Sequence, residues 1–334
     1  MRDVKFFITH YSPALLLLLL AGLNCGCQSA SGWLRRQPPA QNYPIAFPAT
    51  ATREEIVAAL NANTVRVRTL QAPGSVSIPG APSLSSELAL ERPRNLRFRA
   101  GTVLGPEIDL GGNADLFWFW AHRAPSPALF YAQHEKFAVS KARQALAVDP
   151  AWIVDSLGLI EVDPASVVEG PAPIGTDKLE IRIRHQTPGG ETLRLVRVHR
   201  QFGYMMEQHL YDSGGQLIAT TRASEHQHYH IDGVTLPHKI EISVPQAQMT
   251  LTIALGQHTL NQPISGAAAL FTLPQAQYKN YPLVDVADPN FAPPAGPGAI
   301  PAQAPPQISA QPRAPSSPPG QDFRPRYRGG VSLR

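Results

Sequence analysis

The feature that most constrains the fold is a long stretch of alternation over residues 231–273. From Ile240 to Val244, aliphatic and polar residues occupy alternate positions; Pro245 interrupts the pattern, which resumes from Met249 to Leu255. A period of two is typical of a strand with one buried and one solvated face. The Asp-Gly pair at 232–233 indicates a hairpin turn before the first run. The stretch therefore predicts two long antiparallel strands that share a buried face.

Alternation recurs along most of the chain and predicts the remaining strands. It is found at 84–90, 96–98, 108–110, in the run DLFWFW at 115–120, in KLEIRIRH at 178–185, and in three further runs between 192 and 224. The segment 134–159 lacks it and predicts one or two short helices.

The N-terminal end of this region carries a helix start signal. Thr52 is a favourable N-cap residue, and Glu55 lies three positions on, which predicts a helix that ends at Asn61 and Asn63. The residues that follow, 65–68, alternate and predict the first strand. The Ala-Pro-Gly sequence at 72–74 predicts a turn after it.

The elements together predict a curved sheet. Roughly ten to twelve antiparallel strands alternate with few helices, and a flat sheet of that width would need more helix to cover its apolar face. Curling the sheet around its own apolar face solves this. The prediction is an α+β, mostly β fold: a large curved antiparallel sheet, or half-open β-barrel, with a few short helices covering the concave apolar face. The side chains expected to line that face are Leu88, Leu96, Phe98, Ile108, Phe117, Phe119, Ile181, Ile240, Ile242, Leu251 and Ile253.

These strands and turns resemble a known family. The run DG-x-x-LP-x-x-I-x-I, then a Thr-rich alternating strand, LNQPI and LFTLP, is similar to the end of the periplasmic lipoprotein-sorting fold, the LolA/LolB family. Upstream, LALERPRNLRFRA and DLFWFW resemble its early hairpins. The likeness covers roughly Thr52 to Leu273. It implies a half-open barrel whose cavity binds the acyl chains of lipoproteins, and it implies no ligand residue individually.

The N-terminus has the composition of an export signal. Arg2 and Lys5 precede a short, leucine-rich apolar core over residues 14–23, and small residues and two cysteines follow. Cys27 is the predicted lipidation site of a bacterial lipoprotein, and Cys25 is the alternative. A cleaved signal with two incidental cysteines is the remaining possibility.

The residue after the predicted lipidation site bears on the location. By analogy with enterobacterial sorting, Gln28 favours the outer membrane over the inner membrane. The protein is therefore expected to be a periplasm-facing, outer-membrane lipoprotein of a Gram-negative-type bacterium, and its N-terminal lipid is expected to anchor it to the membrane.

The 34 prolines cluster at the two ends of the chain and suggest four segments. Residues 1–27 are the predicted lipoprotein signal peptide, and 28–51 a Pro-rich tether. Residues 52–287 are the predicted LolA/LolB-like β-domain, and 288–334 a Pro-rich disordered tail. The favoured interpretation of the tail is a soluble spacer. The alternative is that three arginines near its end, Arg324, Arg326 and Arg328, contact an anionic surface or an envelope partner.

The interior of the predicted sheet is either a packed core or a pocket. As a pocket it suits acyl chains, so the first hypothesis is a non-enzymatic lipoprotein that binds lipid or lipoprotein acyl chains, in lipoprotein sorting or envelope lipid transport. The alternative is a non-enzymatic envelope scaffold with a filled core.

A third hypothesis is a His-metal enzyme. His226, His228 and His230 fall on one face of a strand and are candidate zinc or copper ligands. No HExxH motif accompanies them, and a solvated strand face is the favoured interpretation. No catalytic residue or cofactor is predicted. The net charge of +4 is too small and too scattered to indicate a nucleic-acid partner.

Overall fold

The computed structural model describes residues 43–47, 50–124, 126–140, 142–145, 151–187 and 190–291, all within one compact unit, Met1–Pro294. The predicted signal peptide, both cysteines, and most of the predicted tether and tail lie outside the described residues. Among the residues described, no helix combines the length and the apolar character needed to cross a bilayer.

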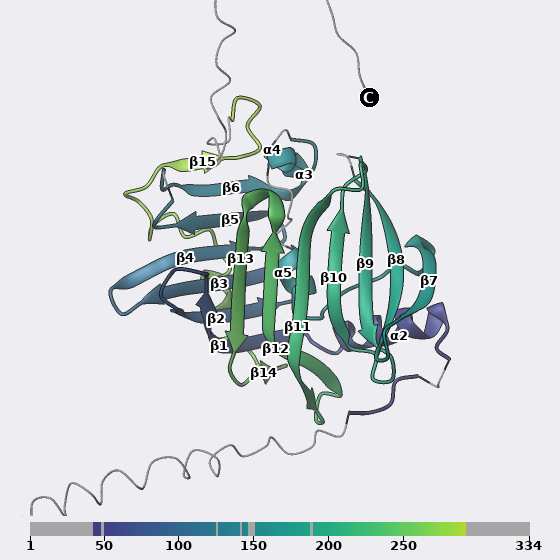
Figure 1. The fold of residues 1–334 in the computed structure, drawn as a ribbon. Helices are drawn as coiled ribbons and strands as arrows, with labels where there is room; N and C mark the ends of the chain where they lie inside the picture. Colours follow the sequence, from purple (N-terminus) through teal and green to yellow (C-terminus); the bar gives the residue numbers. More distant parts are fainter. Residues whose placement is uncertain are drawn as a thin grey trace, which may run out of the picture. The chain divides into compact units, whose positions relative to one another are not determined.

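The described part of the chain forms one sheet of 15 strands (Figure 1). Strands β1 to β6 follow one another as an antiparallel meander, and β7 to β13 form a second one. The two meanders join where β1 pairs with β13, with Val76 opposite Ile253. At one edge β15 lies parallel to β6, and β14 pairs with β1. The predicted fold class, mostly β with a large curved sheet and few short helices, is confirmed.

The strands are β1 (Thr69–Ser77), β2 (Leu84–Glu91), β3 (Asn95–Thr102), β4 (Gly105–Gly112), β5 (Leu116–Ala121), β6 (Leu129–Gln133), β7 (Val167–Ile174), β8 (Lys178–Thr187), β9 (Gly190–His199), β10 (Met205–Tyr211), β11 (Leu217–Tyr229), β12 (Val234–Val244), β13 (Met249–Leu255), β14 (Thr259–Leu260) and β15 (Leu283–Asp285). The helices are α2 (Arg53–Val65), α3 (His134–Ala138), α4 (Ala142–Ala145), α5 (Ala151–Ser156) and α6 (Ala267–Leu270), with 3-10 turns η1 (Pro164–Ser166) and η2 (Pro245–Ala247).

Helix α2 begins where the sequence predicts. The Thr52 hydroxyl accepts the N–H of Glu55 at 3.2 Å, and the Glu55 carboxylate accepts the N–H of Thr52 at 2.8 Å. These two bonds form a capping box, which satisfies donors that the first turn of a helix leaves unpaired.

The end of α2 differs from the prediction, because the helix continues past Asn61 and Asn63 to Val65. Asn61 exchanges two hydrogen bonds of 2.8 Å with the backbone of Val162, and the Asn63 carbonyl accepts the N–H of Thr235 at 2.8 Å. Both amides are thus used to join α2 to distant segments, so they do not end the helix. The predicted strand at 65–68 is therefore wrong; the first strand begins at Thr69.

The predicted turn at 72–74 is also wrong, because β1 runs straight through it. Gly74 pairs with Ser86 of β2 on one side and with Leu255 of β13 on the other. A side chain at Gly74 would overlap the carbonyl oxygen of Ala254. Gly74 therefore does not form a turn; it lets two neighbouring strands approach closely, which is a known role of glycine inside a sheet.

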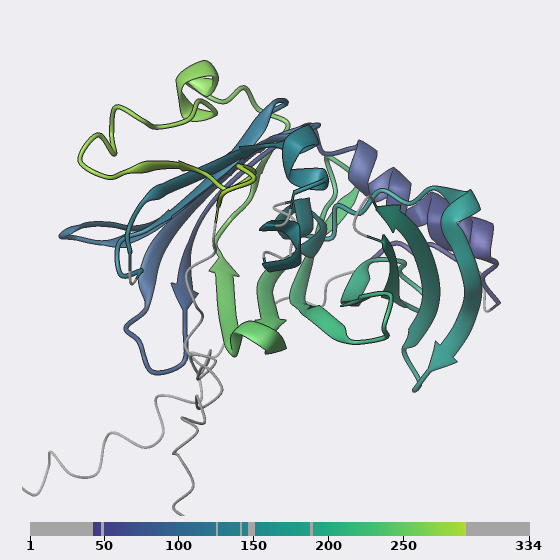
Figure 2. The same ribbon diagram turned by 90° about the horizontal axis from the view of Figure 1, so that it is seen from above.

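Helices α2, α3 and α5 pack on the concave face of the sheet, and Figure 2 shows short helices between the two halves of the sheet. Helix α2 packs Ile56 and Leu60 against strands β8 to β10. Helix α5 and the residue after it pack Ile153 and Leu157 against β1 to β3, β12 and β13. The hydrophobic core is thus split along the curve of the sheet into one cluster under each helix.

The C-terminal part of the described chain covers the opposite, convex face. Tyr278 stacks on Trp120 with 4.5 Å between ring centroids, and Trp118 and Leu129 are buried beside them. The backbone carbonyl of Leu270, in α6, accepts a hydrogen bond from the Arg97 side chain of β3 on the same face. Besides the helices predicted for the concave face, α6 lies over the convex face, because the tryptophans of β5 give that face an apolar patch of its own.

Candidate functional site

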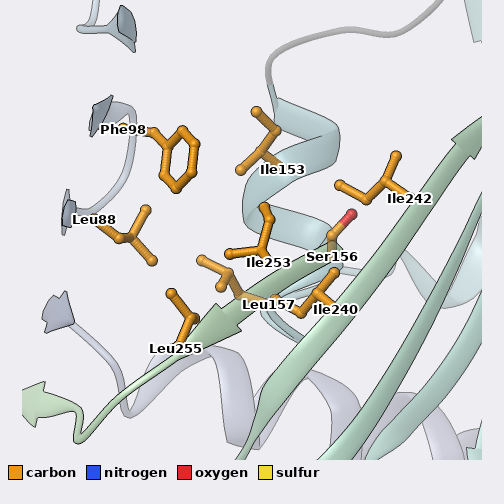
Figure 3. A pocket seen from close by; sticks show the side chains of 9 residues that line it. All are labelled: Leu88, Phe98, Ile153, Ser156, Leu157, Ile240, Ile242, Ile253 and Leu255. Atoms are coloured by element: carbon orange, nitrogen blue, oxygen red, sulfur yellow. The ribbon is translucent and has the colours of Figure 1, made fainter. Parts of the chain in front are cut away.

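The concave interior holds an apolar cavity beneath α5 (Figure 3). Helix α5 and the residue after it contribute Ile153, Ser156 and Leu157. The strands contribute five residues that the sequence predicts to line the interior, and also Leu255, which it does not. The five are Leu88, Phe98, Ile240, Ile242 and Ile253. The volume of about 10 Å³ is close to what one water molecule needs. Helix α5 packs over this part of the interior.

The other predicted lining residues lie on the same face but not in this cavity. Leu96, Ile108 and Leu251 belong to the surrounding core. Ile181 is buried under α2. Phe117 and Phe119 pack in a third cluster with Phe137 of α3, Phe130 and Val286; the Phe119 and Phe130 rings stack at 4.8 Å. The alternation thus selects the correct face, whereas the helices divide that face into separate compartments.

A buried polar network holds α5 on the sheet. The Arg194 guanidinium of β9 donates to the Asp155 carboxylate at 2.5 Å and to the Gln208 side-chain carbonyl at 2.5 and 3.1 Å. The Ser156 and Thr221 hydroxyls lie 2.9 Å apart. Thr221 and Gln208 are fully buried, and the Arg194–Asp155 pair is partly buried. Together these bonds fix the position of α5.

The sequence predicts short helices within 134–159 and over the concave face, but no residue of α5 is among the predicted lining residues. The signal that identifies it is the spacing of Ile153 and Leu157, which are four residues apart and therefore lie on one face of a helix. Between them, Asp155 and Ser156 carry the polar ties to β9 and β11.

A second feature was missed at the tip of the β3–β4 hairpin. Val103 and Leu104 are 104% and 95% exposed. Hairpin tips normally carry polar or turn-forming residues, and two neighbouring aliphatic side chains there are held in water at a cost in free energy. The signal in the sequence is the apolar pair inside Thr-Val-Leu-Gly. Such a tip can enter an apolar phase such as the edge of a bilayer.

The histidines of the third hypothesis have separate partners. His226 is buried and donates its Nε2–H to the carbonyl of Met205 at 2.8 Å. The rings of His228 and His230 lie 4.7 Å apart, and His228 Nδ1 bonds the Thr235 hydroxyl at 2.9 Å. Across the described residues, no group of three His, Cys, Asp or Glu side chains is placed to hold a metal ion.

Two buried histidines predict an acid-sensitive fold. Burial is the main cause that lowers the pKa of His226 to about 4. The charges of His199 and His238 lower this pKa further, and the hydrogen bond to Met205 raises it. Burial and then the His238 charge lower the pKa of His258 to about 3. Both groups take up protons more readily when unfolded, so stability is full above about pH 6.5 and is lost as the pH falls toward these values.

For His226 the expected loss is about 1.4 kcal/mol per pH unit below about pH 6.5, or roughly 2 kcal/mol at pH 5. Urea unfolding of wild type and His226→Gln at pH 7 and pH 5 measures it. The glutamine keeps a donor for Met205 but does not titrate, so the variant is expected to lose about 2 kcal/mol less between the two pH values. Equal losses would show that His226 is not the titrating group.

The fold and site define a class: a half-open β-barrel with an apolar interior closed by short helices. No family model and no curated protein matches the sequence.

Solved structures with a similar fold include three bacterial proteins. One is a domain assigned to outer membrane lipoprotein sorting from Vibrio parahaemolyticus, with a TM-score of 0.46 and 9% identity over 66% of this chain and 100% of that chain. A LolA superfamily protein from Nitrosomonas europaea has a TM-score of 0.42 and 10% identity, and the match covers 67% of this chain and 98% of that chain. A DUF1329 family protein from Desulfovibrio piger has a TM-score of 0.43 and 10% identity, and the match covers 66% of this chain and 100% of that chain. The first two descriptions name the family that the strand pattern resembles, and the likeness is one of fold.

Proposed function

We propose that this protein is an outer-membrane-anchored periplasmic lipoprotein that binds lipid or lipoprotein acyl chains in the concave interior of its sheet. The observation that carries the proposal is the cavity beneath α5, whose lining is aliphatic and aromatic apart from Ser156. A lining without charge suits a hydrocarbon chain and disfavours an ionic guest, which would lose its hydration there.

The cavity in its closed state is smaller than the guest. Ligand pockets usually have volumes of about 300 Å³ or more, and here α5 fills the space with Ile153 and Leu157. An acyl chain takes the place of these side chains when α5 moves off the sheet. Exposing the two side chains costs about 3–6 kcal/mol, whereas burying roughly twelve methylenes contributes about 10 kcal/mol. Burial of the acyl chain therefore offsets the exposure of these two side chains.

The exposed hairpin tip supports a role at a membrane. Val103 and Leu104 lie on the strand pair β3–β4, and β3 also supplies Phe98 to the cavity lining. Insertion of the tip into a bilayer would remove two aliphatic side chains from water, which contributes about 3 kcal/mol or more. A tip and a cavity on neighbouring strands suit transfer of acyl chains to or from the membrane that the anchor occupies, as in lipoprotein sorting or lipid transport.

One observation favours a second candidate function. The small volume of the cavity, about 10 Å³, is also what a filled structural core would show. In that case the protein is an envelope scaffold whose partners bind its surface. The two functions differ in whether α5 leaves the sheet.

Loosening α5 is expected to increase acyl binding. Asp155→Asn removes a charge from the contact with Arg194, and a hydrogen bond between charged groups contributes about 1.5–3 kcal/mol. The open state then becomes more populated, so the apparent affinity of residues 43–291 for a fluorescent fatty-acyl probe should rise about tenfold or more. A fluorescence titration measures this.

Asp163→Asn is the matched control. Asp163 is an exposed carboxylate that caps η1 through the N–H of Ala165 at 3.0 Å, away from the network of α5. It should leave probe affinity unchanged. If wild type and Asp155→Asn both fold and neither binds the probe, the scaffold function stands and the acyl-binding proposal is contradicted.

A further inference from the structure

A second cavity, of about 270 Å³, lies on the other side of α2 from the sheet core. It is formed where the segment Tyr43–Phe47 crosses between α2, the β9–β10 turn and the β11–β12 turn. Residues 59, 62 and 63 of α2 face it, as does Arg66 directly after the helix, while Ile56 and Leu60 of α2 face the sheet. The cavity therefore shares no lining residue with the one beneath α5.

Small residues leave this space open. Gly203 has φ +70, and a side chain there would lie 2.8 Å from Phe47 and 2.9 Å from Ala46. The glycine lets the segment approach closely enough for the N–H of Ala46 to bond the carbonyl of Gln201 at 2.7 Å. Within the range predicted as a tether, this segment is thus attached to the domain, and Phe47 is buried in its core. The alanines of α2 then leave room beneath it.

The polar groups of this cavity are cationic or are hydrogen-bond donors. Arg66 gives one of its five N–H groups to the carbonyl of Gly233 at 2.9 Å. Throughout the described part of the chain, no carboxylate forms an ion pair with Arg66, and the lining contains no Asp or Glu. Its guanidinium therefore retains donors and a positive charge for a further partner.

His228 and Tyr204 complete the polar side of the cavity. His228 bonds the Thr235 hydroxyl through Nδ1 at 2.9 Å, which leaves Nε2 for another partner. Burial lowers the pKa of His228, and so do the charges of His230 and then Arg66, which places His228 and Arg66 in one electrostatic environment. Burial raises the pKa of Tyr204 to about 12, with smaller contributions from Tyr43 and Asp177, so its hydroxyl keeps its proton.

We propose that this cavity binds a small organic anion whose phosphate or carboxylate group is held by Arg66 and His228. The apolar body of the ligand lies against Ala59, Ala62 and the ring of Phe202, which line the same space. A guanidinium with free donors matches the geometry of both oxyanions. The volume suits a single ring or a short chain, and the site is independent of acyl binding.

The test is a calorimetric titration of the full-length chain, purified in detergent, with three probes of similar size. Phenyl phosphate and benzoate carry an oxyanion on an apolar ring, and benzyl alcohol carries the ring alone. At least one of the two anions should bind, about tenfold or more tighter than benzyl alcohol. Raising the salt concentration should weaken the binding of the anion, because the site is partly open to water and its charge is screened.

Two variants separate the charge of the site from its volume. Arg66→Gln should weaken anion binding about tenfold or more, and Arg66→Lys should restore part of it. Ala62→Leu fills the cavity without touching the charge and should abolish binding. Arg68→Gln removes an exposed arginine of the same stretch that does not line the cavity, and it should change nothing.

The thermal unfolding midpoint of each variant guards against misfolding, since Arg66 also holds the turn at Gly233. The proposal is overturned if neither anion binds with a Kd below about 10 mM. Equal binding of benzyl alcohol, or anion binding that survives both Arg66→Gln and Ala62→Leu in folded protein, overturns it as well. None of these outcomes depends on whether acyl chains bind beneath α5.

Discussion

Asp109→Ala is expected to lower the free energy of unfolding by about 3–5 kcal/mol, because it leaves the buried Arg97 guanidinium without its counter-charge. Asp109 of β4 is 0% exposed and Arg97 of β3 is 4% exposed, and the two side chains are 2.5 Å apart. The Tyr278 hydroxyl also donates to Asp109 at 2.8 Å. Removing the carboxylate therefore breaks two contacts in a region closed to water.

The C-terminal segment creates this environment. Arg97 donates to the carbonyl of Leu270 at 3.0 Å and lies 5.3 Å above the ring of Trp118. Burial, and then the charge and hydrogen bond of Asp109, raise the pKa of Tyr278, so its hydroxyl remains a donor. The pair thus fastens α6 and Tyr278 to the convex face, and its loss should loosen that whole segment.

The matched control is an ion pair that shares strand β3 with the buried pair. Arg99 of β3 and Glu87 of β2 form an ion pair of similar length, 2.7 Å, but their side chains are 41% and 71% exposed. Glu87→Ala should therefore cost only about 0–1 kcal/mol. Urea unfolding followed by tryptophan fluorescence compares the variants, since Trp118 and Trp120 lie at the site. A cost for Asp109→Ala no larger than that for Glu87→Ala would contradict the assignment.

A double variant separates burial of charge from packing. Replacing the pair by Arg97→Met and Asp109→Leu removes both charges and keeps much of the volume. Such exchanges of buried pairs are often neutral or stabilising, so the double variant should be clearly more stable than Asp109→Ala. An equally unstable double variant would indicate that packing, and not the unpaired charge, accounts for the loss.

Cys27→Ser is expected to release the protein from membranes completely. The proposed anchor is the acylated Cys27 thiol, and no other cysteine than Cys25 is available in the sequence. Each buried methylene of an anchor contributes about 0.8 kcal/mol, so loss of several chains leaves no stable membrane binding. Membrane fractionation and labelling with palmitate measure the effect.

Cys25→Ser is the control for this prediction, because it removes the neighbouring thiol and should leave labelling intact. Labelling that persists in Cys27→Ser but disappears in Cys25→Ser would move the anchor to Cys25. If neither substitution changes labelling or fractionation, the protein is not a lipoprotein and the proposed location is wrong.

The strands and their buried faces follow from local sequence. Alternation is a property of neighbouring residues, and it correctly places Ile240 and Ile253 on the buried face of their strands. The pairing of the two residues comes from the structure. The start of α2 is equally local, because Thr52 and Glu55 are three residues apart. The curvature of the sheet follows from the shortage of helix. These features need no knowledge of distant contacts.

The features that sequence reasoning missed depend on residues far apart in the chain. Asn63 bonds Thr235, which lies 172 positions away, and this bond explains why an asparagine lies inside α2. Tyr278 bonds Asp109 across 169 positions, so the covering of the convex face leaves no local pattern. The compartments of the interior are equally non-local, because Ile181 alternates like Ile253 and yet lies under another helix.

The most direct test of acyl binding places a photoreactive amino acid at Ile242 or at Glu241 in the full-length protein in cells. The two residues are neighbours on β12: Ile242 lines the cavity, and Glu241 lies on the opposite face, near Arg222. After illumination, mass spectrometry of the purified protein should show adducts with the mass of an acyl-bearing molecule at position 242 and not at 241. Absence of such adducts at 242, or equal adducts at both positions, would contradict the proposal that this interior binds acyl chains.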